Sequence, residues 1–217
     1  MKINFKNINK MYEKKKIVID TNILLKSKKI INLLGSNGSG KSTIIKIVLN
    51  IIKSTENKIS YFINKKEIKN INKIKNIIGY MPQNPKFPGN LKTEELINLF
   101  EELKDIKPIF KNELIESLNI NSFINKKINQ LSHGMVQKIN ILQAFMFNNL
   151  IYILDEPTAG VDEKTSEILK YIINKKKKNG GCFFFTSHIK SDTVELSDIN
   201  IRVEEGIIKF IKKNDKK

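Results

Sequence analysis

The sequence predicts an α/β fold with a mainly parallel central sheet, an N-terminal antiparallel β portion and an inserted helical subdomain. Three observations predict it. Short apolar runs alternate with helical segments along much of the chain, which is typical of parallel strands joined by helical crossovers. A glycine-rich segment, 35–42, follows one apolar run, and the acidic pair Asp155 and Glu156 follows another. The stretch 84–147 has a helical period and interrupts the alternation.

The N-terminal part of the chain is expected to be rich in strands. Its run 30–34 is mostly apolar, as expected of a strand buried on both faces. Pro82, Pro85 and Pro88 then break the pattern and mark a boundary. In chain order we expect strands over 3–5, 17–25 and 30–34, a helix over 42–52, and strands over 58–63 and 76–80.

The rest of the chain predicts a helical lobe and a return to the sheet. We expect a single domain with a core lobe, 1–83 and 148–217, and a helical lobe, 84–147. The lysine run 175–178 is expected to be a solvated turn. After the helical lobe we expect a strand over 150–154, a helix over 162–174, a strand over 182–186, short strands near 199–203 and 207–211, and a frayed end over 209–217.

The composition is that of a folded protein, with an unusual balance of charge. The 217 residues include 39 Lys and Arg against 22 Asp and Glu, a formal charge of +17, and Arg202 is the only arginine. The single cysteine, Cys182, excludes a disulfide-stapled secreted domain and favours a reducing compartment. No apolar run approaches the roughly 18–20 residues that span a bilayer, and the first residues do not resemble a signal peptide. We therefore expect a cytoplasmic location.

The positive charge has three interpretations. Lysines neutralise phosphates, so a basic chain invites a nucleic-acid function. However, arginine is nearly absent and exposed aromatic residues are not interleaved with the lysines, which weakens specific recognition. A composition biased toward Lys, Ile and Asn would produce the same excess on a solvated surface, and this is the interpretation we favour; no specific nucleic acid is expected as a partner. Weak attraction to an anionic membrane face is the third.

The segment 35–42 reads Gly-Ser-Asn-Gly-Ser-Gly-Lys-Ser and fits the phosphate-loop pattern G-x-x-x-x-G-K-[S/T], with a strand before it and a helix after it. Glycines let successive backbone N–H groups turn inward as an anion nest, and the helix start adds a positive dipole end. Lys41 can reach the β- and γ-phosphates, and the Ser42 hydroxyl can ligate Mg²⁺. These features predict a P-loop NTPase. The candidate nucleotide-binding residues are Gly35, Ser36, Asn37, Gly38, Ser39, Gly40, Lys41, Ser42 and Thr43.

The second candidate feature is the acidic pair at the end of the run 150–154. The carboxyl ends of parallel strands meet at one edge of a sheet, so this pair is expected beside the phosphate loop. Asp155 then suits Mg²⁺, directly or through water, and Glu156 could orient or deprotonate an attacking water.

With these motifs in place, nearly the whole chain resembles the ATP-binding cassette (ABC) transporter family. Tyr-Met-Pro-Gln at 80–83 resembles the glutamine loop of that family, and Leu-Ser-His-Gly-Met at 131–135 resembles its signature segment. Pro-Thr-Ala-Gly-Val-Asp at 157–162 resembles the loop after the acidic strand, and Thr-Ser-His at 186–188 resembles the histidine switch.

The resemblance implies a Mg²⁺-dependent ATPase that works as a dimer. It implies that Gln83 ligates Mg²⁺ or its water, and that Ser132 and Gly134 hold the γ-phosphate bound by the phosphate loop of a second ABC ATPase subunit, identical or different. ATP would join two cassettes head to tail, and hydrolysis would release them. His188 would contact the γ-phosphate or hold Glu156 and water in line, while Lys41 and Glu156 act in catalysis.

Two further residues carry alternatives. The family uses the acid at Asp162 at the subunit interface, but this residue could serve chiefly as a helix N-cap. Tyr12 resembles the aromatic residue that stacks on adenine, although Glu13 follows it where glycine is usual, and a simple core tyrosine is the alternative.

The signature segment departs from the common family pattern. His133 replaces glycine and Met135 replaces glutamine, while Ser132 and Gly134 are retained. The Ser-x-Gly-Met form resembles the branch that exports drugs, antimicrobial peptides and polysaccharides. The resemblance implies an integral membrane permease as partner, docked on the helical lobe near 84–90, and a peripheral location on the inner membrane face. The alternative is a soluble ABC ATPase acting on nucleic acid, ribosomes or protein assembly.

Overall fold

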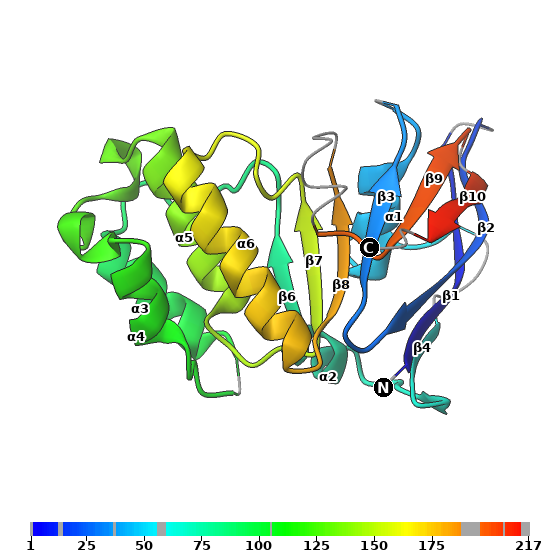
Figure 1. Cartoon of the computed structure of the whole chain (residues 1–217), viewed down its shortest axis with the longest axis horizontal. Coiled ribbons are helices and arrows are strands. Elements are labelled where there is room, and N and C mark those ends of the chain that lie inside the picture. Colours follow the sequence, from blue (N-terminus) through cyan, green and yellow to red (C-terminus); the bar gives the residue numbers. More distant parts are fainter. Residues whose placement is uncertain are drawn as a thin grey trace.

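The computed structural model describes residues 2–12, 15–36, 38–55, 60–104, 106–187, 196–205 and 207–213. Within them the chain forms a six-stranded sheet with a smaller four-stranded sheet on one side and a group of helices on the other (Figure 1). The phosphate-loop segment and the acidic pair both lie at the ends of strands of the six-stranded sheet.

The smaller sheet confirms the expected N-terminal antiparallel portion. Its strand order is β2-β1-β4-β5, and every pair is antiparallel. In β2 the side chains alternate, with Ile23 and Leu25 buried and Leu24 exposed, because one face packs inward and the other faces water. The strands are β1 (Lys2–Tyr12), β2 (Lys15–Lys26), β4 (Ser60–Ile63) and β5 (Lys66–Glu67).

The central sheet has the order β10-β9-β3-β8-β7-β6. All its described pairs are parallel except β10 with β9, so the predicted mainly parallel sheet is confirmed. The strands β3, β7 and β8 are almost wholly buried, as their apolar sequences predict. The strands are β3 (Ile30–Leu34), β6 (Ile78–Met81), β7 (Ile151–Asp155), β8 (Cys182–Thr186), β9 (Ile199–Glu204) and β10 (Ile207–Lys213).

The helices cover both faces of the central sheet (Figure 1). Helix α1 lies between the two sheets, where its apolar face is buried together with β1 and β2. Helices α3 to α5 lie at the edge formed by β6, and α6 crosses beside them (Figure 1). The helices are α1 (Lys41–Val48), α2 (Ile71–Asn76), α3 (Thr93–Glu102), α4 (Lys111–Ser117), α5 (His133–Phe145) and α6 (Glu163–Lys178), with 3-10 turns at Ile120–Phe123 and Ile128–Gln130.

Two apolar cores hold the layers together. One joins the small sheet, α1 and the central sheet, and the other joins α5 and α6 to β7 and β8. In the second core the ring of Tyr152 stacks between Phe145, at 5.1 Å, and Phe183, at 4.7 Å. Gly79 in β6 lets α5 approach closely, because a Cβ there would lie 2.1 Å from the carbonyl oxygen of Ala144.

Three sequence predictions about elements were wrong, and one helix was missed. The end expected to fray from 209 instead continues strand β10 to Lys213, where it pairs with β9. Helix α1 ends at Val48 rather than at 52, and Asn50 adopts a left-handed φ of 55° just beyond it. Helix α2, capped by the Asn70 side chain, was not expected. The lysine run 175–178 is not a turn: it forms the last turn of α6, where cations favour the negative end of the helix dipole.

One lysine of that run, Lys176, is buried in the second core region. It is 5% exposed, its Nζ lies 2.9 Å from the centroid of the Phe110 ring, and it has no hydrogen-bond partner among the described residues. Burial lowers the pKa of Lys176 to about 7, against a smaller opposing effect of Glu113. The folded chain therefore carries a cation that is stabilised less than it is in water.

We predict that Lys176→Met raises the free energy of unfolding at pH 7 by about 2 kcal/mol. Between pH 7 and 10.5 the unfolded wild type binds more protons at this site than the folded form does, so wild-type stability rises with pH there. The gain from the substitution is therefore largest near pH 7 and shrinks toward pH 10.5. Urea unfolding at several pH values measures it, with Lys178→Met at the exposed end of α6 as control. A variant less stable than wild type at pH 7 would contradict the prediction.

Candidate functional site

The loop between β3 and α1 has the backbone shape of an anion-binding loop. Gly35 has φ 156°, and a Cβ there would lie 2.5 Å from Oγ of Ser39 and 2.7 Å from the carbonyl oxygen of Val203. Gly40, at the N-cap of α1, has a left-handed φ of 107°. Only glycine fits both places, and because glycine has no Cβ a ligand can approach the loop backbone closely.

Lys41 starts α1 and reaches back over the loop. Its Nζ donates to the carbonyl oxygens of Gly35, at 2.7 Å, and Ser36, at 3.0 Å. Burial lowers the pKa of Lys41, while the charges of Glu156 and Asp155 act to raise it, so the lysine lies within electrostatic reach of the acidic pair. The first turn of α1 also presents Ser42, which is exposed, and Thr43, which is half-buried.

The strand register explains why the loop and the acidic pair lie close together. Strand β8 lies between β3 and β7, and Thr186 at its end pairs with Leu33 on one side and Asp155 on the other. The phosphate loop leaves β3 two residues after Leu33, and Glu156 directly follows Asp155. Both features therefore leave the same edge of the sheet at the same level.

The Thr186 hydroxyl connects the two acidic residues. It donates to Oδ1 of Asp155 at 2.6 Å and accepts from the backbone N–H of Glu156 at 3.0 Å. Glu156 has a left-handed φ of 50°, which is unusual outside glycine, and its backbone N–H also lies 3.1 Å from the carbonyl oxygen of Thr186. The sequence prediction missed Thr186 as a site residue because nothing in its local pattern shows this cross-strand contact.

Gln83 follows β6 with an exposed side chain, and helix α5 holds its backbone. Gln137 donates from Nε2 to the carbonyl oxygen of Gln83 at 3.2 Å, and Asn140 donates from Nδ2 to that of Pro82 at 2.8 Å. Both α5 side chains are buried, and Gln143 donates to Oδ1 of Asn140 at 2.9 Å. The glutamine loop is therefore fastened to the helix that carries the signature segment, a contact the sequence prediction also missed.

The signature residues occupy the N-terminus of α5. Ser132 is the N-cap, and its Oγ accepts from the backbone N–H of Met135 at 3.3 Å. Gly134 lies in the first turn, and a Cβ there would meet no atom within 4 Å. The His133 ring packs on Gly160, where a Cβ would lie 2.6 Å from Cε1 of the histidine.

Asp162 caps helix α6. Its Oδ1 accepts from the backbone N–H of Thr165 at 2.8 Å, and its Oδ2 accepts from the Thr165 hydroxyl at 2.9 Å. These hydrogen bonds lower the pKa of Asp162. The N-cap alternative considered for this acid therefore has a direct structural basis.

The structure unites some candidate residues and separates others. Lys41, Asp155 and Glu156 share one end of the central sheet, whereas α1 and α5 lie on opposite sides of β7 and β8 (Figure 1). The signature residues on α5 and the phosphate loop before α1 are therefore separated by the central sheet. Candidates His188 and Asn37 lie outside the described residues, and Tyr12 ends β1 with a side chain outside the described part.

A glycine-rich loop between a buried strand and a helix, with Lys41 near two acids from another parallel strand of the same sheet, defines a P-loop nucleoside triphosphatase. Residues 18–159 match the profile of the family described as ABC transporter. The chain therefore belongs to the ABC transporter family and is an ATP-binding, ATP-hydrolysing subunit of the kind its relatives represent. The α/β fold and the family resemblance are confirmed.

Named relatives extend over most of the chain. The zinc import ATP-binding protein ZnuC of Hydrogenovibrio crunogenus is 31% identical over 86% of this chain and 72% of its own length. The lipopolysaccharide export system ATP-binding protein LptB of Haemophilus influenzae is 30% identical over 88% and 82%. The bacitracin transport ATP-binding protein BcrA of Bacillus licheniformis is 33% identical over 92% and 66%. All three are transport proteins, which favours a transporter ATPase over the soluble alternative.

Solved structures agree on the fold. The structure of an ATP-binding subunit of an ABC transporter superposes with a TM-score of 0.90 at 22% identity, over 99% of this chain and 91% of that one. A dimeric bacterial ABC transporter cassette superposes with a TM-score of 0.79 at 23% identity, over 97% and 99%. Among the described residues, no helix combines the length and apolar character needed to cross a membrane.

We predict that Thr186→Val lowers the ATPase rate about tenfold, because the isosteric side chain removes a hydrogen bond to the Asp155 carboxylate and another from the Glu156 backbone. Thr93→Val is the matched control, since this buried hydroxyl donates to the carbonyl oxygen of Lys126 in the helical lobe. Steady-state phosphate release measures both. If both variants lose activity equally and in proportion to their loss of stability, Thr186 acts only through stability and has no role in the site.

Proposed function

We propose that this chain hydrolyses ATP with Mg²⁺ at composite sites between two cassettes, and that the cycle drives transport through a separate membrane permease. The observation that supports it most directly is the register of β3, β8 and β7, which brings the phosphate loop and the acidic pair to one edge. The division into a core lobe, 1–83 and 148–217, and a helical lobe, 84–147, is part of the proposal.

The loop residues fit a nucleotide triphosphate. The Ser39 hydroxyl is buried with no hydrogen-bond partner among the described residues, and the Lys41 ammonium lies over carbonyl oxygens of the loop itself. A bound phosphate chain would supply oxygen acceptors to both groups. Loop N–H groups of 35–43 would hold the same oxygens, and Tyr12 would stack on the base.

The residues also fit Mg²⁺. This ion prefers oxygen ligands and usually takes one or two carboxylates together with substrate phosphates. Ser42, Gln83 and Asp155 supply a hydroxyl, an amide and a carboxylate of this kind. When bound, the ion would neutralise charge on the phosphate oxygens.

Glu156 is the proposed base or orienting group for the attacking water. Its backbone N–H is held by Thr186, which fixes the backbone of this strained residue beside Asp155. His188 is proposed to contact the γ-phosphate or to align Glu156 and the water. Lys41 would stabilise the charge that develops on the transferred group.

The second half of each site is proposed to come from another cassette. Ser132 and Gly134 lie at the N-terminus of the 13-residue helix α5, where backbone N–H groups and the helix dipole favour an anion. The bacterial cassette that superposes on this chain is dimeric, which supports a head-to-tail dimer here. Asp162 is proposed to contribute at that interface as well as capping α6.

The transport role follows from the relatives. Their names include import of zinc and export of lipopolysaccharide, so the chain is proposed to act on the inner membrane face through an integral permease docked on residues 84–90. The Ser-x-Gly-Met signature and the bacitracin-transport relative support assignment to the exporter branch.

We predict that Glu156→Gln slows hydrolysis by orders of magnitude, because the amide cannot accept the proton of water, while ATP binding persists. Dimers should then accumulate with Mg²⁺ and ATP. Phosphate release, nucleotide binding and gel filtration measure the three properties, with Glu116→Gln on α4 as an exposed control. Only monomer in Mg-ATP would contradict the dimer mechanism.

Composite sites make a second prediction, because two inactive variants should complement each other. Lys41→Ala disables the phosphate loop, and Gly134→Asp places a negative charge where the anion would bind, in a position with space for a side chain. A mixed dimer of these chains retains one site with both halves intact. We expect mixing to restore ATPase activity well above that of either variant alone, whereas the double variant Lys41→Ala/Gly134→Asp should restore none when mixed with either. If the mixture is as inactive as its components, the phosphate loop and the signature residues of each site come from the same chain.

A further inference from the structure

The positive charge is not spread evenly along the chain. Residues 1–83 contain 18 lysines and four acidic residues, a net charge of +14 out of the total +17. The remaining 134 residues contain 21 basic and 18 acidic residues. A bias in composition explains why lysine is abundant, but it does not explain why acidic residues are so rare in one part of the chain.

Pairing between β strands brings several of these lysines together. Lys2 in β1 lies directly opposite Lys26 in β2. Asn64, in the turn after β4, accepts from the backbone N–H of Lys2 at 3.1 Å and donates its own N–H to the carbonyl oxygen of Lys2 at 2.9 Å. The exposed residues Lys65 and Lys66 follow Asn64 directly, so this turn adds two charges beside Lys2.

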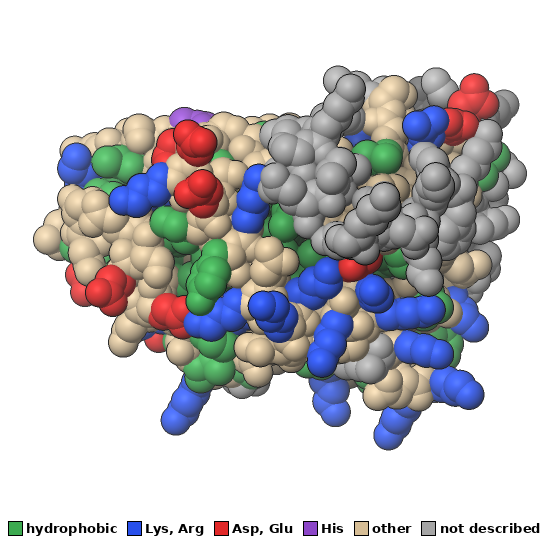
Figure 2. Space-filling model, in the orientation of Figure 1, with side chains coloured by type: hydrophobic (Ala, Val, Ile, Leu, Met, Phe, Trp, Pro, Cys, Tyr) green, Lys and Arg blue, Asp and Glu red, His purple; other side chains and the backbone are tan. Residues whose placement is uncertain are grey.

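The same surface continues to the end of α6. The turn between β2 and β3 contacts the residues after α6, because the Ser27 hydroxyl donates to the carbonyl oxygen of Gly180 at 2.7 Å and Lys28 N–H donates to that of Gly181 at 3.1 Å. We call this surface the lysine edge, and it lies along the lower right margin of Figure 2. Its members are Lys2, Lys26, Lys28, Lys29, Lys65, Lys66, Lys177 and Lys178.

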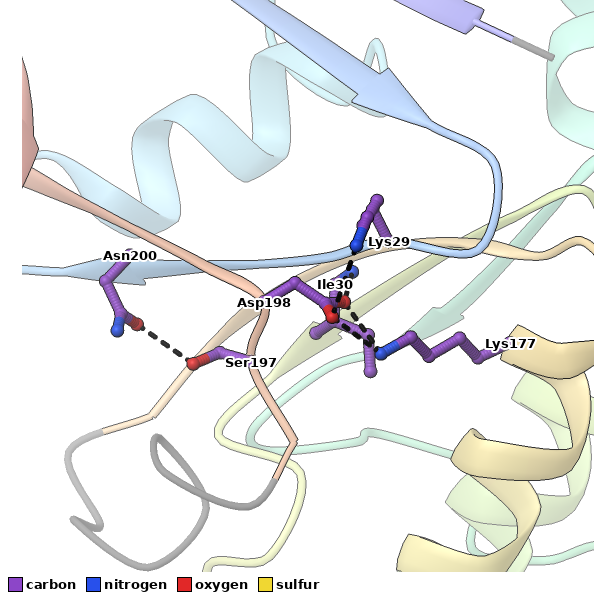
Figure 3. Close-up of polar contacts among 6 residues, drawn as sticks. All are labelled: Lys29, Ile30, Lys177, Ser197, Asp198 and Asn200. Atoms are coloured by element: carbon purple, nitrogen blue, oxygen red, sulfur yellow. Dashed lines mark hydrogen bonds and ion pairs between the residues drawn. The ribbon is translucent and has the colours of Figure 1, made fainter. Parts of the chain in front are cut away.

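One carboxylate is built into the lysine edge. Asp198 forms ion pairs with Lys29 at 3.7 Å and Lys177 at 2.7 Å, and it accepts from the backbone N–H of Ile30 at 2.8 Å (Figure 3). Its side chain is only 12% exposed; this burial is the largest single influence and acts to raise the pKa of Asp198, but the hydrogen bonds and ion pairs together hold that pKa below its ordinary value. Among the described residues no other ion pair involves the lysine edge, and only Glu67 beside Lys66 adds a nearby exposed acid. The edge therefore keeps a large net positive charge.

The lysine edge is separate from the candidate nucleotide site. Lys29 precedes β3, and the contacts at Gly180 and Gly181 precede β8, so the edge lies at the amino ends of these strands. The phosphate loop and the acidic pair leave the carboxyl ends. The mechanism in the preceding subsection uses none of these eight lysines.

We propose that the lysine edge binds the anionic surface of a lipid membrane directly. The choice of a membrane rests on the proposed function, which assigns the chain to the inner membrane face. Lysine ammonium groups suit headgroups, which need point charge rather than the bidentate geometry that arginine gives to nucleic-acid recognition. Leu24, 44% exposed and two residues before Lys26 on the same face of β2, adds an apolar contact of the kind an interface accepts.

Vesicle sedimentation of the purified full chain tests the proposal without ATP or a permease. The probes are vesicles of phosphatidylcholine alone and vesicles that also contain phosphatidylglycerol, in low salt. We expect binding only to the anionic vesicles and its loss when salt is raised, because screening weakens exposed charge interactions.

A matched pair of variants locates the surface. Lys26→Gln, Lys28→Gln and Lys65→Gln together remove three charges from the edge, and Lys107→Gln, Lys126→Gln and Lys127→Gln remove three exposed charges from the helical lobe. At about 1 kcal/mol for each lysine near an anionic surface, the first triple variant should bind anionic vesicles about 100-fold more weakly. The second should bind as wild type does, and both should retain ATPase activity.

Three results would overturn the proposal: no binding of wild type to anionic vesicles, equal weakening by the two triple variants, or tighter edge-dependent binding to RNA or DNA than to vesicles. The last would assign the edge to nucleic acid. None of these results bears on the Glu156→Gln or mixed-dimer experiments. Conversely, vesicle binding would stand if those experiments failed.

Discussion

The register of strand β8 between β3 and β7 is the constraint on which the rest of the site depends. Three residues from distant parts of the chain, Leu33, Thr186 and Asp155, lie level across the sheet. A slip of one residue would turn the Thr186 hydroxyl to the opposite face and separate it from the Asp155 carboxylate. Because all three strands are buried, packing on both faces resists such a slip, and the geometry of the site is a property of the core.

Much of the fold could be predicted from the sequence because its strongest signals are local. The strands β3 and β8 begin and end where their apolar runs do. The ends of helices were less predictable. Apolar residues continue the helical pattern of α1 beyond the point where Asn50 turns left-handed, and the lysines that end α6 resemble a loop in composition although lysine is a good helix former.

The residues of the site also fall into two groups, those that short motifs predict and those that only contacts between distant parts of the chain reveal. The phosphate loop and the acidic pair are contiguous motifs, so their chemistry could be read from short segments. Thr186 and the α5 residues Gln137 and Asn140 act through residues 30 to 58 positions away in the chain. A single sequence contains no signal for such contacts, since a buried threonine or asparagine has the same local pattern with or without a partner. The lysine edge likewise arises only when strand pairing and turn contacts gather lysines from four separate segments.

Helix α5 packs on the central sheet at its C-terminal end and carries the signature residues at its N-terminal end. Its C-terminal end packs closely on β6, where a Cβ at Gly79 would lie 2.1 Å from the carbonyl oxygen of Ala144, and this contact can serve as a pivot. Gln137 and Asn140 attach the glutamine loop partway along the helix, and Ser132 stands at the far end, about 18 Å from the pivot at 1.5 Å per residue. A rotation of about 10° about the pivot moves Ser132 by about 3 Å, the length of one hydrogen bond. A small displacement of the glutamine loop is thus enough, on geometry alone, to make or break a contact at the tip.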